Sequence, residues 1–551
     1  MAEGCNTMPV VTLYLDRLQR LVGKTSREKI ISTLPFLGLD IEEQTDQYIR
    51  VEYSPNRPDY ATDFGIAAGL QGLLGIKKGL AKLDVKRGPY QLKADQSVRK
   101  IRPYVTAIVA KNGTLDDETI RQLITLQEDL HFGIGRNRKK SSIGIHDLDK
   151  IEFPLRYTTA TKEHRFVPLG AETENSISEI LQNTEVGLQY GTLLENAEAV
   201  PIILDAKGNT ISFPPIINSA LTTVSSSTKN LLVEVTATDK NTAEDTLSVV
   251  AATLQNAGFL LTSVQISGAG NTTPSLKTKK MSLGVELANK ILGLKLPSSI
   301  ISAALKKCRL DALPKKNKIS CTIPRFRFDI LGPMDLIEEV ALGYGIENLK
   351  PTLPQSAAVG QKNIVTKQLD LLGKIMIGLG FTEALNSSLV SKSIQYGMTN
   401  RDSFGFLQVV ESKSQEHTIL RDMLLPSMLD TLSRNVHEQY PQKLFEIGTV
   451  FSADDPIKEE ISLCCISAHK DANYSEIKSI LQSALKTGFN IECQTSTSTN
   501  FCFAKGKTAD VIANNSKVGA IGEVDSAIVE NFKIRMPVVA FEIKLSGLIF
   551  N

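Results

Sequence analysis

Several features that would place this chain in a familiar class are missing from its sequence. Its cysteines show no CxxC spacing, which argues against a zinc site and against a disulfide framework. No apolar run approaches the roughly 18 residues of a membrane span, and the polar N-terminus lacks the pattern of a signal peptide. We therefore expect a cytoplasmic protein that does not cross a membrane and keeps its cysteines as reduced core thiols. The cysteines are residues 5, 308, 321, 464, 465, 493 and 502.

The net charge and the composition of the chain exclude few classes of protein. A formal net charge of +2 argues neither for nor against nucleic acid, so local patches of charge must decide. With 42% hydrophobic and 22% charged residues, the composition is ordinary for a globular protein. A chain of 551 residues is too long for one hydrophobic core, so we expect three or four domains.

The stretch at 324–349 is the most informative part of the chain. Its first half alternates arginine with phenylalanine as far as Asp329, which predicts a strand with one apolar and one charged face. Gly332 ends this strand, and Pro333 suits the first turn of the helix that follows. The stretch therefore predicts a strand-to-helix junction.

Four carboxylates gather at this junction: Asp329, Asp335, Glu338 and Glu339. The last three are spaced i, i+3 and i+4, so they share one face of the helix, where like charges repel by about a few tenths of a kcal/mol per pair. A hard divalent cation such as Mg²⁺ would reverse that cost, because it prefers oxygen ligands. The alternatives are an acidic first turn that complements the helix macrodipole, or ion pairs with Arg325 or Arg327.

The same stretch resembles the acidic segment of the phenylalanine–tRNA ligase β-subunit family, in which four such carboxylates bind magnesium. Asp329, Asp335, Glu338 and Glu339 match that pattern residue by residue, and the sequence GYGI at 343–346 also fits. The resemblance implies that these four residues bind Mg²⁺. It extends from about residue 8 to the end of the chain, with several motifs in the same order as in the family.

The resemblance implies a multidomain α/β and α+β fold. We expect an N-terminal α/β module, an editing domain that hydrolyses aminoacyl-tRNA, a winged-helix-like domain with the acidic metal site, and a class II synthetase-like antiparallel sheet that is catalytically inactive. The expected bounds are 1–82, 99–270, 275–350 and 355–551. In the first module, the turn NRPD at 56–59 is near-identical to the family's turn, and the small residues of the following helix permit close packing.

Within residues 99–270, a basic run at 136–140 precedes a strand that carries His146 and Asp147. Cationic side chains beside a His/Asp pair favour a substrate that contains phosphate. The alternative is a solvated basic turn with one structural histidine. The segments SIGIHDLDK, SFPPIINS and EVTATD resemble the family's editing domain, which hydrolyses tyrosine mischarged onto tRNA. Where that family usually has TGTD, this chain has TATD at 236–239.

The resemblance places an editing pocket in this domain. A pocket that distinguishes tyrosine from phenylalanine must pair the extra hydroxyl, and we assign Glu234 or Asp239 to that role. Asn218 would hold the aminoacyl group, and His146 the terminal adenosine of the tRNA. We expect water to be the nucleophile, because no serine or cysteine here has an evident partner base. The tRNA phosphates would be bound by Arg136, Arg138 and Lys139.

Residues 275–322 read as two short helices, about 284–292 and 298–308, followed by a hairpin with a lysine-rich edge. This winged-helix-like order could bind nucleic acid, or it could be a packing module with a solvated charged face. A non-catalytic nucleic-acid-binding regulator is therefore the rival interpretation, and a pure assembly scaffold is a third. A regulator has no use for a pocket built from His146, Asn218 and Glu234.

Residues 355–551 resemble the family's catalytic-like module through SKSQE at 412–416 and KLFEIGTVF at 443–451. A working class II site needs arginines that clamp the ATP phosphates. The glycine-rich candidate at 518–523 carries no arginine, so we assign adenylation to a separate α subunit that binds ATP and phenylalanine. The resemblance thus implies the β subunit of an α2β2 aminoacyl-tRNA ligase for phenylalanine, in the compact archaeal and eukaryotic-cytoplasmic form, with tRNA(Phe) as a further partner.

Overall fold

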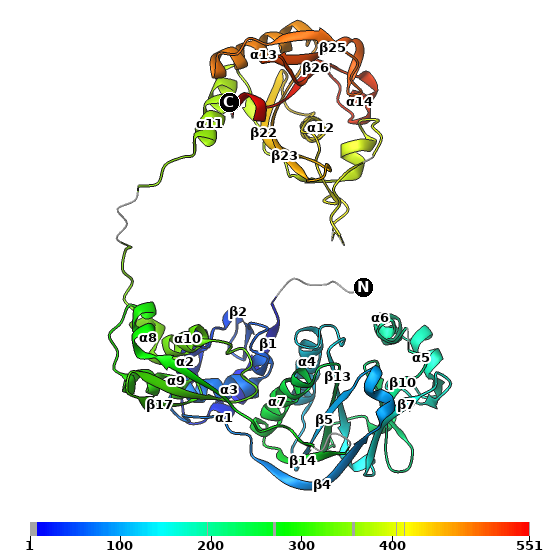
Figure 1. Cartoon of the computed structure of the whole chain (residues 1–551), viewed down its shortest axis with the longest axis vertical. Helices are drawn as coiled ribbons and strands as arrows, with labels where there is room; N and C mark the ends of the chain where they lie inside the picture. The colour runs from blue at the N-terminus through cyan, green and yellow to red at the C-terminus, as the bar shows by residue number, and fades with distance from the viewer. Residues whose placement is uncertain are drawn as a thin grey trace. The chain divides into compact units, whose positions relative to one another are not determined.

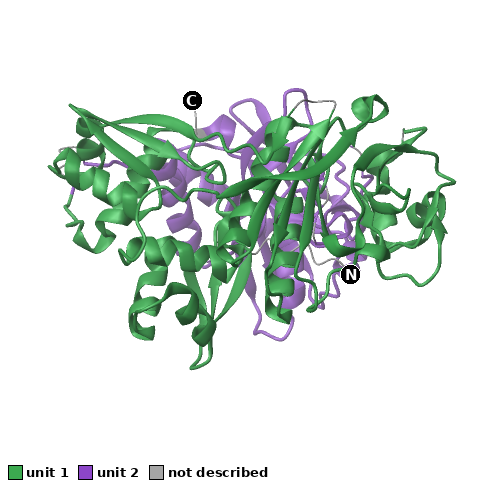
Figure 2. Cartoon of the chain, turned by 90° about the horizontal axis from the view of Figure 1, so that it is seen from below, with its two compact units in different colours: residues 1–353 green, residues 354–551 purple. Residues whose placement is uncertain are grey.

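The computed structural model divides the chain into two compact units, Met1–Leu353 and Pro354–Asn551 (Figures 1 and 2). No helix in the described part of the chain is long and apolar enough to cross a membrane. The structure describes residues 8–195, 197–267, 271–354, 359–403, 405–410, 412 and 414–549.

The N-terminal module is a three-stranded antiparallel sheet, ordered β1-β3-β2, covered by helices. Gly65 of helix α3 permits the NRPD turn to lie against that helix, since a Cβ there would stand 1.6 Å from the Asp59 carbonyl oxygen. Gly72 does the same for the winged-helix-like domain, because its Cβ would meet the Lys307 carbonyl at 2.1 Å. The small residues therefore pack two parts of the same chain together. The elements are β1 (Val10–Tyr14), α1 (Leu15–Val22), α2 (Arg27–Thr33), β2 (Asp40–Gln44), β3 (Tyr48–Glu52) and α3 (Asp63–Leu73).

The next domain is built on a ten-stranded mixed sheet, ordered β12-β11-β10-β7-β4-β14-β5-β13-β6, with β15 paired to β14. Every residue of β13 is buried, so this strand is apolar almost throughout, as expected where both faces are covered. Figure 1 shows α4 and α7 beside this part of the sheet, and α7 contacts β13 and β5. The strands are β4 (Val85–Ala94), β5 (Tyr104–Lys111), β6 (Ser141–Asp147), β7 (Leu155–Ala160), β10 (Val200–Leu204), β11 (Thr210–Phe213), β12 (Ile217–Asn218), β13 (Leu231–Ala237), β14 (Leu260–Ser267) and β15 (Asn271–Thr273). The helices are α4 (Asp117–Phe132), α5 (Ile177–Asn183), α6 (Glu185–Tyr190) and α7 (Lys240–Asn256).

The winged-helix-like domain has a three-stranded antiparallel sheet, β16-β18-β17, and three helices. Helices α9 and α10 touch at Gly343, where a Cβ would stand 2.1 Å from the Ala304 carbonyl oxygen. Pro333 occupies the first turn of α10, as predicted. The elements are β16 (Lys279–Gly284), α8 (Val285–Leu292), α9 (Ser298–Lys307), β17 (Asp311–Lys315), β18 (Lys318–Ile323) and α10 (Pro333–Tyr344).

The strand predicted at 325–329 is wrong. Strand β18 ends at Ile323, and the chain continues in two turns closed by hydrogen bonds from the Arg327 amide to the Pro324 carbonyl and from the Ile330 amide to the Arg327 carbonyl. Arg327 is only 4% exposed, because it turns inward to meet carboxylates. The alternation of arginine and phenylalanine therefore reflects a buried ion-pair cluster rather than the two faces of a strand.

The second unit has a seven-stranded sheet, ordered β19-β22-β23-β27-β26-β25-β24, whose strands pair antiparallel except β19 with β22. One face packs against α11 and α13, and the other against α12 and α14, so the central strands are apolar on both sides. The antiparallel sheet predicted for this region is confirmed. Lys413, within the SKSQE match, and Glu411, directly before it, lie outside the described residues. The main elements are α11 (Ile364–Gly378), β19 (Thr382–Glu383), α12 (Leu425–Arg434), β22 (Gln442–Ser452), β23 (Lys458–Ala468), α13 (Tyr474–Phe489), β24 (Gln494–Thr497), β25 (Phe503–Ala513), β26 (Ser516–Val524), α14 (Ser526–Asn531) and β27 (Val538–Lys544).

Candidate functional site

A cavity of about 500 Å³ lies in the domain with the ten-stranded sheet, between α4, β6 and β13 on one side and the loop around β12 on the other. Most of its wall is apolar, contributed by side chains such as Ile120, Leu123 and Ile216. A few polar groups face this wall, among them Glu234 and Asn218. An apolar cavity with a few placed polar groups is the usual form of a small-molecule site.

The polar end of the cavity is centred on Gly144, which pairs with Glu234 in the antiparallel register of β6 and β13. A Cβ on Gly144 would stand 2.5 Å from Glu234 Oε1, 2.5 Å from His146 Nε2 and 3.1 Å from Asn218 Oδ1. Three of the predicted pocket residues therefore converge on one glycine. Only a residue without a side chain leaves room for them there.

Glu234 is 2% exposed, and its Oε2 atom has no hydrogen-bond partner among the described residues. A buried carboxylate oxygen without a donor costs free energy, on the order of 1–3 kcal/mol or more for a charged group. Glu234 is one of the residues that line the cavity. A ligand that brings a hydroxyl group to this end of the cavity would supply the missing donor.

His146 lies within the protein rather than on the cavity wall, since its side chain is 0% exposed. Its Nδ1 is 2.8 Å from the Thr222 hydroxyl, and its Nε2 has no hydrogen-bond partner and stands 3.9 Å from Glu234 Oε1. The assignment of His146 to the tRNA adenosine gains no support from this position and stays a prediction. In the structure the histidine is held by the Thr222 hydroxyl.

Asp239 does not line the cavity. It is exposed and caps helix α7, where its Oδ1 accepts hydrogen bonds from the Thr242 amide at 2.7 Å and the Thr242 hydroxyl at 2.8 Å. The hydrogen bond from the Thr242 amide, together with that from its hydroxyl, lowers the pKa of Asp239. Its assignment to the tyrosine hydroxyl is wrong, because the carboxylate is already committed to the first turn of the helix.

The predicted basic residues form an unusual turn at the edge of the cavity. Arg136, Asn137 and Arg138 all have left-handed backbone, with φ of 48°, 51° and 63°. Each such residue costs about 1–2 kcal/mol, so a run of three is held by its surroundings. Strain of this kind is often found at functional sites.

The three predicted tRNA-binding residues, Arg136, Arg138 and Lys139, lie differently with respect to the cavity. Arg138 lines the cavity, donates to the Ile216 carbonyl at 2.9 Å, pairs with Glu128 at 3.0 Å and stacks on Tyr190. It is therefore part of the wall. Arg136 and Lys139 are exposed and remain candidates for contacts to phosphate.

Several residues of the site were missed from the sequence. Gly144 and Thr222 carry no local signal, because their roles depend on which strands become neighbours. His131, at the end of α4, accepts a hydrogen bond from the Ile143 amide through Nε2. Burial lowers the pKa of His131, so this accepting nitrogen is kept unprotonated. Arg102 is buried behind Thr236, and burial lowers its pKa to about 10.

The acidic junction is organised by Arg327, which forms ion pairs with Asp329 and Glu339. Its guanidinium donates to Asp329 at 2.7 and 2.9 Å and also pairs with Glu339, which is 5% exposed. Although burial opposes ionisation, Arg327 lowers the pKa of Asp329. Asp335 accepts from the Leu331 and Gly332 amides, both at 2.7 Å, and so caps its own helix.

The four carboxylates consequently do not form one ligand set. Asp329 and Glu339 are neutralised by Arg327, Asp335 is engaged as a cap, and Glu338 is exposed. In the part of the chain that the structure describes, no group of three or more His, Cys, Asp or Glu side chains is placed to hold a metal ion. These residues do not fit a Mg²⁺ ion as they stand, and the magnesium site stays a prediction. Both alternatives are present, because Arg327 pairs with Asp329 and Glu339, and Asp335 lies in the first turn of α10.

The second unit has a cavity of about 780 Å³ over its sheet. Gly519 on β26 lines it, and its Cβ would stand 2.0 Å from the Glu542 carbonyl oxygen, so this glycine serves close strand packing. The one arginine among the described lining residues is Arg401, which pairs with Asp422. The buried Arg421 pairs with Glu446 at 2.6 Å. Neither arginine is free to clamp a phosphate.

Comparison with known proteins gives a consistent result over the whole chain. Family models match at 349–545 (phenylalanyl tRNA synthetase beta chain CLM domain), 281–346 (tRNA synthetase B5 domain) and 112–251 (B3/4 domain). The phenylalanine–tRNA ligase beta subunit of Archaeoglobus fulgidus is 38% identical, with 98% of each chain covered. That of Methanococcoides burtonii is 32% identical, covering 98% of this chain and all of the relative.

A solved structure agrees with the sequence comparisons. It is an N-terminal fragment of the phenylalanyl-tRNA synthetase beta subunit from Pyrococcus horikoshii, 31% identical, with a TM-score of 0.58. The match covers 61% of this chain and 99% of the fragment.

Proposed function

Since the chain belongs to the phenylalanine–tRNA ligase β-subunit family, we propose that it serves as the β subunit of an enzyme that joins phenylalanine to tRNA(Phe) with ATP. Relatives at 32–38% identity match along almost their full length, which supports the assignment of the whole chain. The partners proposed are an α subunit, in an α2β2 heterotetramer, and tRNA(Phe). We place the complex in the cytoplasm, where aminoacyl-tRNA is consumed.

Adenylation of phenylalanine is assigned to the α subunit, which would also bind ATP. The argument is the chemistry of the second unit, whose cavity offers only an arginine that is already paired. ATP phosphates in a class II site need free guanidinium groups. The second unit is therefore proposed as a scaffold for the α subunit. Mg²⁺ would enter with ATP on that subunit, since magnesium is commonly held by substrate phosphates.

The 500 Å³ cavity is proposed as an editing site that hydrolyses tyrosine mischarged onto tRNA(Phe). The observation that carries this proposal is the unpaired Oε2 of Glu234 at the end of an apolar cavity. A tyrosyl ring would lie against the apolar wall and donate its hydroxyl to that oxygen. A phenylalanyl ring would leave the carboxylate unpaired, at a cost of about 1–3 kcal/mol, or roughly 5- to 150-fold in binding.

The ester end of the substrate would lie toward Asn218, whose Oδ1 accepts from the Ser212 hydroxyl at 3.2 Å. That contact orients the amide so that its nitrogen can donate to the aminoacyl group. A water molecule attacks the ester carbonyl carbon, the bond to the terminal ribose oxygen breaks, and a proton from the water passes to that oxygen, so that tyrosine and tRNA are released. Arg136 and Lys139 are proposed to contact the tRNA phosphates.

The test compares deacylation of Tyr-tRNA(Phe) and Phe-tRNA(Phe) by the assembled enzyme. Glu234→Ala should erase the preference for the tyrosyl ester and leave aminoacylation with phenylalanine nearly unchanged. Asp239→Ala is the matched control: it should lower stability by about 1 kcal/mol through loss of the helix cap and keep the preference. Equal hydrolysis of both esters by the unmodified enzyme, or an unaltered preference in Glu234→Ala, would show that the cavity does not edit.

A further inference from the structure

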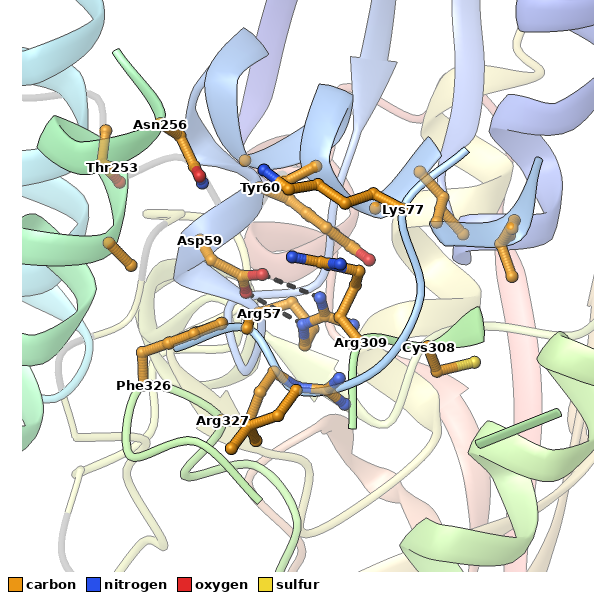
Figure 3. Close-up of a pocket in the computed structure, with 18 of the residues that line it drawn as sticks. Arg57, Asp59, Tyr60, Lys77, Thr253, Asn256, Cys308, Arg309, Phe326 and Arg327 are labelled. Carbon is orange, nitrogen blue, oxygen red and sulfur yellow. Dashed lines mark hydrogen bonds and ion pairs between the residues drawn. The ribbon is translucent and has the colours of Figure 1, made fainter. Parts of the chain in front are cut away.

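A second cavity, of about 280 Å³, lies in the first unit, where the N-terminal module, helix α7 and the winged-helix-like domain meet (Figure 3). It is separate from the editing cavity, with which it shares no lining residue. Neither tRNA editing nor adenylation, as proposed above, uses it. Its size is slightly below the range of about 300–1,000 Å³ that is typical of small-molecule pockets.

The cavity has an excess of positive charge. Five cationic side chains line it against two carboxylates, Asp59 and Glu339. Two of the cations are already neutralised, because Arg57 forms a two-point ion pair with Asp59 at 2.8 and 2.9 Å, and Arg327 pairs with Asp329 and Glu339. The other three cations are Lys77, Lys82 and Arg309.

No ion pair is found for these three cations among the described residues, and Arg309 is the one of the three that is partly buried rather than exposed. Its Nε atom is buried and has no hydrogen-bond partner. Burial lowers the pKa of Arg309, and no neighbouring carboxylate opposes that effect. Figure 3 shows its guanidinium in the same part of the cavity as Arg57 and Arg327. A cation that is partly withdrawn from water and left unpaired matches the requirement of an anionic ligand.

The backbone at Arg309 is also unfavourable for an arginine. The residue follows the C-terminal end of α9 with φ of 63°, and the Leu310 amide donates back to the Leu305 carbonyl. This is the helix-ending motif in which glycine is the usual residue, since only glycine adopts left-handed backbone without cost. The fold therefore tolerates a strained residue at the position that presents the guanidinium to the cavity.

The cavity is covered by a short strap, residues 77–83, that is fixed to the end of α9. The Gly79 amide donates to the Lys306 carbonyl at 2.8 Å, and the Ala81 amide donates to the Arg309 carbonyl at 3.0 Å. Lys77 and Lys82, on this strap, are exposed at the cavity edge.

The remaining lining matches a flat, partly apolar ligand. Phe36, Leu37 and Phe326 provide apolar surface, and Thr253 and Asn256, at the end of α7, provide hydrogen-bonding groups. We propose that this cavity binds a small phosphorylated molecule of mononucleotide type. Its phosphate pairs with Arg309 and the strap lysines, and its base lies against the apolar part of the lining.

The experiment is a calorimetric titration of the full chain without its α subunit, so that no second nucleotide site contributes. The probes are AMP and adenosine. AMP should bind, adenosine should bind at least about tenfold more weakly, and Arg309→Gln should lose at least about tenfold in affinity for AMP, as expected for a charge-assisted contact. Lys290→Gln, an exposed lysine on α8 outside the cavity, is the matched control and should bind AMP as the unmodified chain does.

A second variant separates ligand binding from folding. Arg309→Gly relieves the left-handed backbone, so it should keep or raise the Tm and still lose AMP binding. Absence of AMP binding at millimolar concentration, or unchanged affinity in both Arg309 variants, would overturn the proposal. Displacement of AMP by tRNA(Phe), with Arg309 variants losing tRNA affinity equally, would assign the phosphate contact to RNA and would also overturn it.

Discussion

Gly144 offers the sharpest test of the editing cavity, because a single methyl group there meets all three polar groups of the site. In Gly144→Ala the new Cβ would stand 2.5 Å from Glu234 Oε1 and from His146 Nε2. Contacts below 3.0 Å force a neighbour to move, yet His146 is 0% exposed and Glu234 only 2%. Overpacking of this kind costs about 1–3 kcal/mol.

That cost is expected to fall on the position of Glu234, which must give way toward the cavity. A loss of about 1–3 kcal/mol in binding of the transition state corresponds to roughly 5- to 150-fold in the rate of deacylation. The assay measures kcat/KM for Tyr-tRNA(Phe) deacylation by the assembled enzyme, alongside aminoacylation with phenylalanine, which should not change. The measured fall should lie within that range.

The control is Gly191→Ala in the same domain, where the nearest atom to a Cβ is 3.5 Å away on the Leu181 side chain. This substitution makes an ordinary contact and should leave deacylation and stability unchanged. If Gly144→Ala hydrolyses Tyr-tRNA(Phe) at the unmodified rate, the reacting groups lie elsewhere and the assignment of Glu234 fails. If both variants lose activity equally, the domain is merely sensitive to any added volume.

Three further outcomes are expected. Glu339→Gln breaks a buried ion pair with Arg327, so it should lower the free energy of unfolding by about 3 kcal/mol or more, with or without Mg²⁺. The exposed Glu338, changed to Gln, should alter the stability little. Chemical denaturation measures both, and a loss of stability seen only with Mg²⁺ present would instead support a metal site. Burial raises the pKa of Glu542 to about 7, against hydrogen bonds from the Leu424 and Leu425 amides. Between pH 4.5, the pKa in the unfolded chain, and about pH 7, the native state therefore holds a proton on Glu542 that the unfolded state has lost. The free energy of unfolding should fall by up to about 3 kcal/mol as the pH rises across that window, and Glu542→Gln should remove this slope. A variant whose stability depends on pH as that of the unmodified chain does would contradict this prediction. The full chain alone should not catalyse ATP–pyrophosphate exchange, and robust exchange would overturn the assignment of adenylation to the α subunit.

The sequence was sufficient for features that depend on local order. The helix at 333–344 was predicted from Gly332 and Pro333, because helix starts are set by a few adjacent residues. The antiparallel sheet of the second unit and the family of the chain followed from motifs that keep their order along the chain. Glu234, which was assigned to an editing pocket through the family resemblance, lies in the lining of a cavity, while its role there stays a prediction.

Other features could not be read from the sequence, because they depend on contacts between distant segments. Arg327 and Phe328 looked like neighbours on opposite faces of a strand, but Glu339 and Asp329 draw the arginine inward, and the backbone turns. Asp239 lies five residues beyond Glu234 and seemed to belong to the same site, yet it caps a helix that leads away. Local spacing cannot distinguish a ligand from a cap or from one half of an ion pair.

The roles of Gly144 and Arg309 could not be predicted from the sequence for the same reason. Each is ordinary in its local sequence, and each is defined by what lies across from it. Gly144 is defined by side chains of β13 and β12, and Arg309 by a cavity closed by the strap at 77–83. Charge, volume and hydrogen-bonding needs are local properties of a residue. Whether they are met depends on the burial and the neighbours that the folded chain provides, and those arise only when segments far apart in sequence pack together.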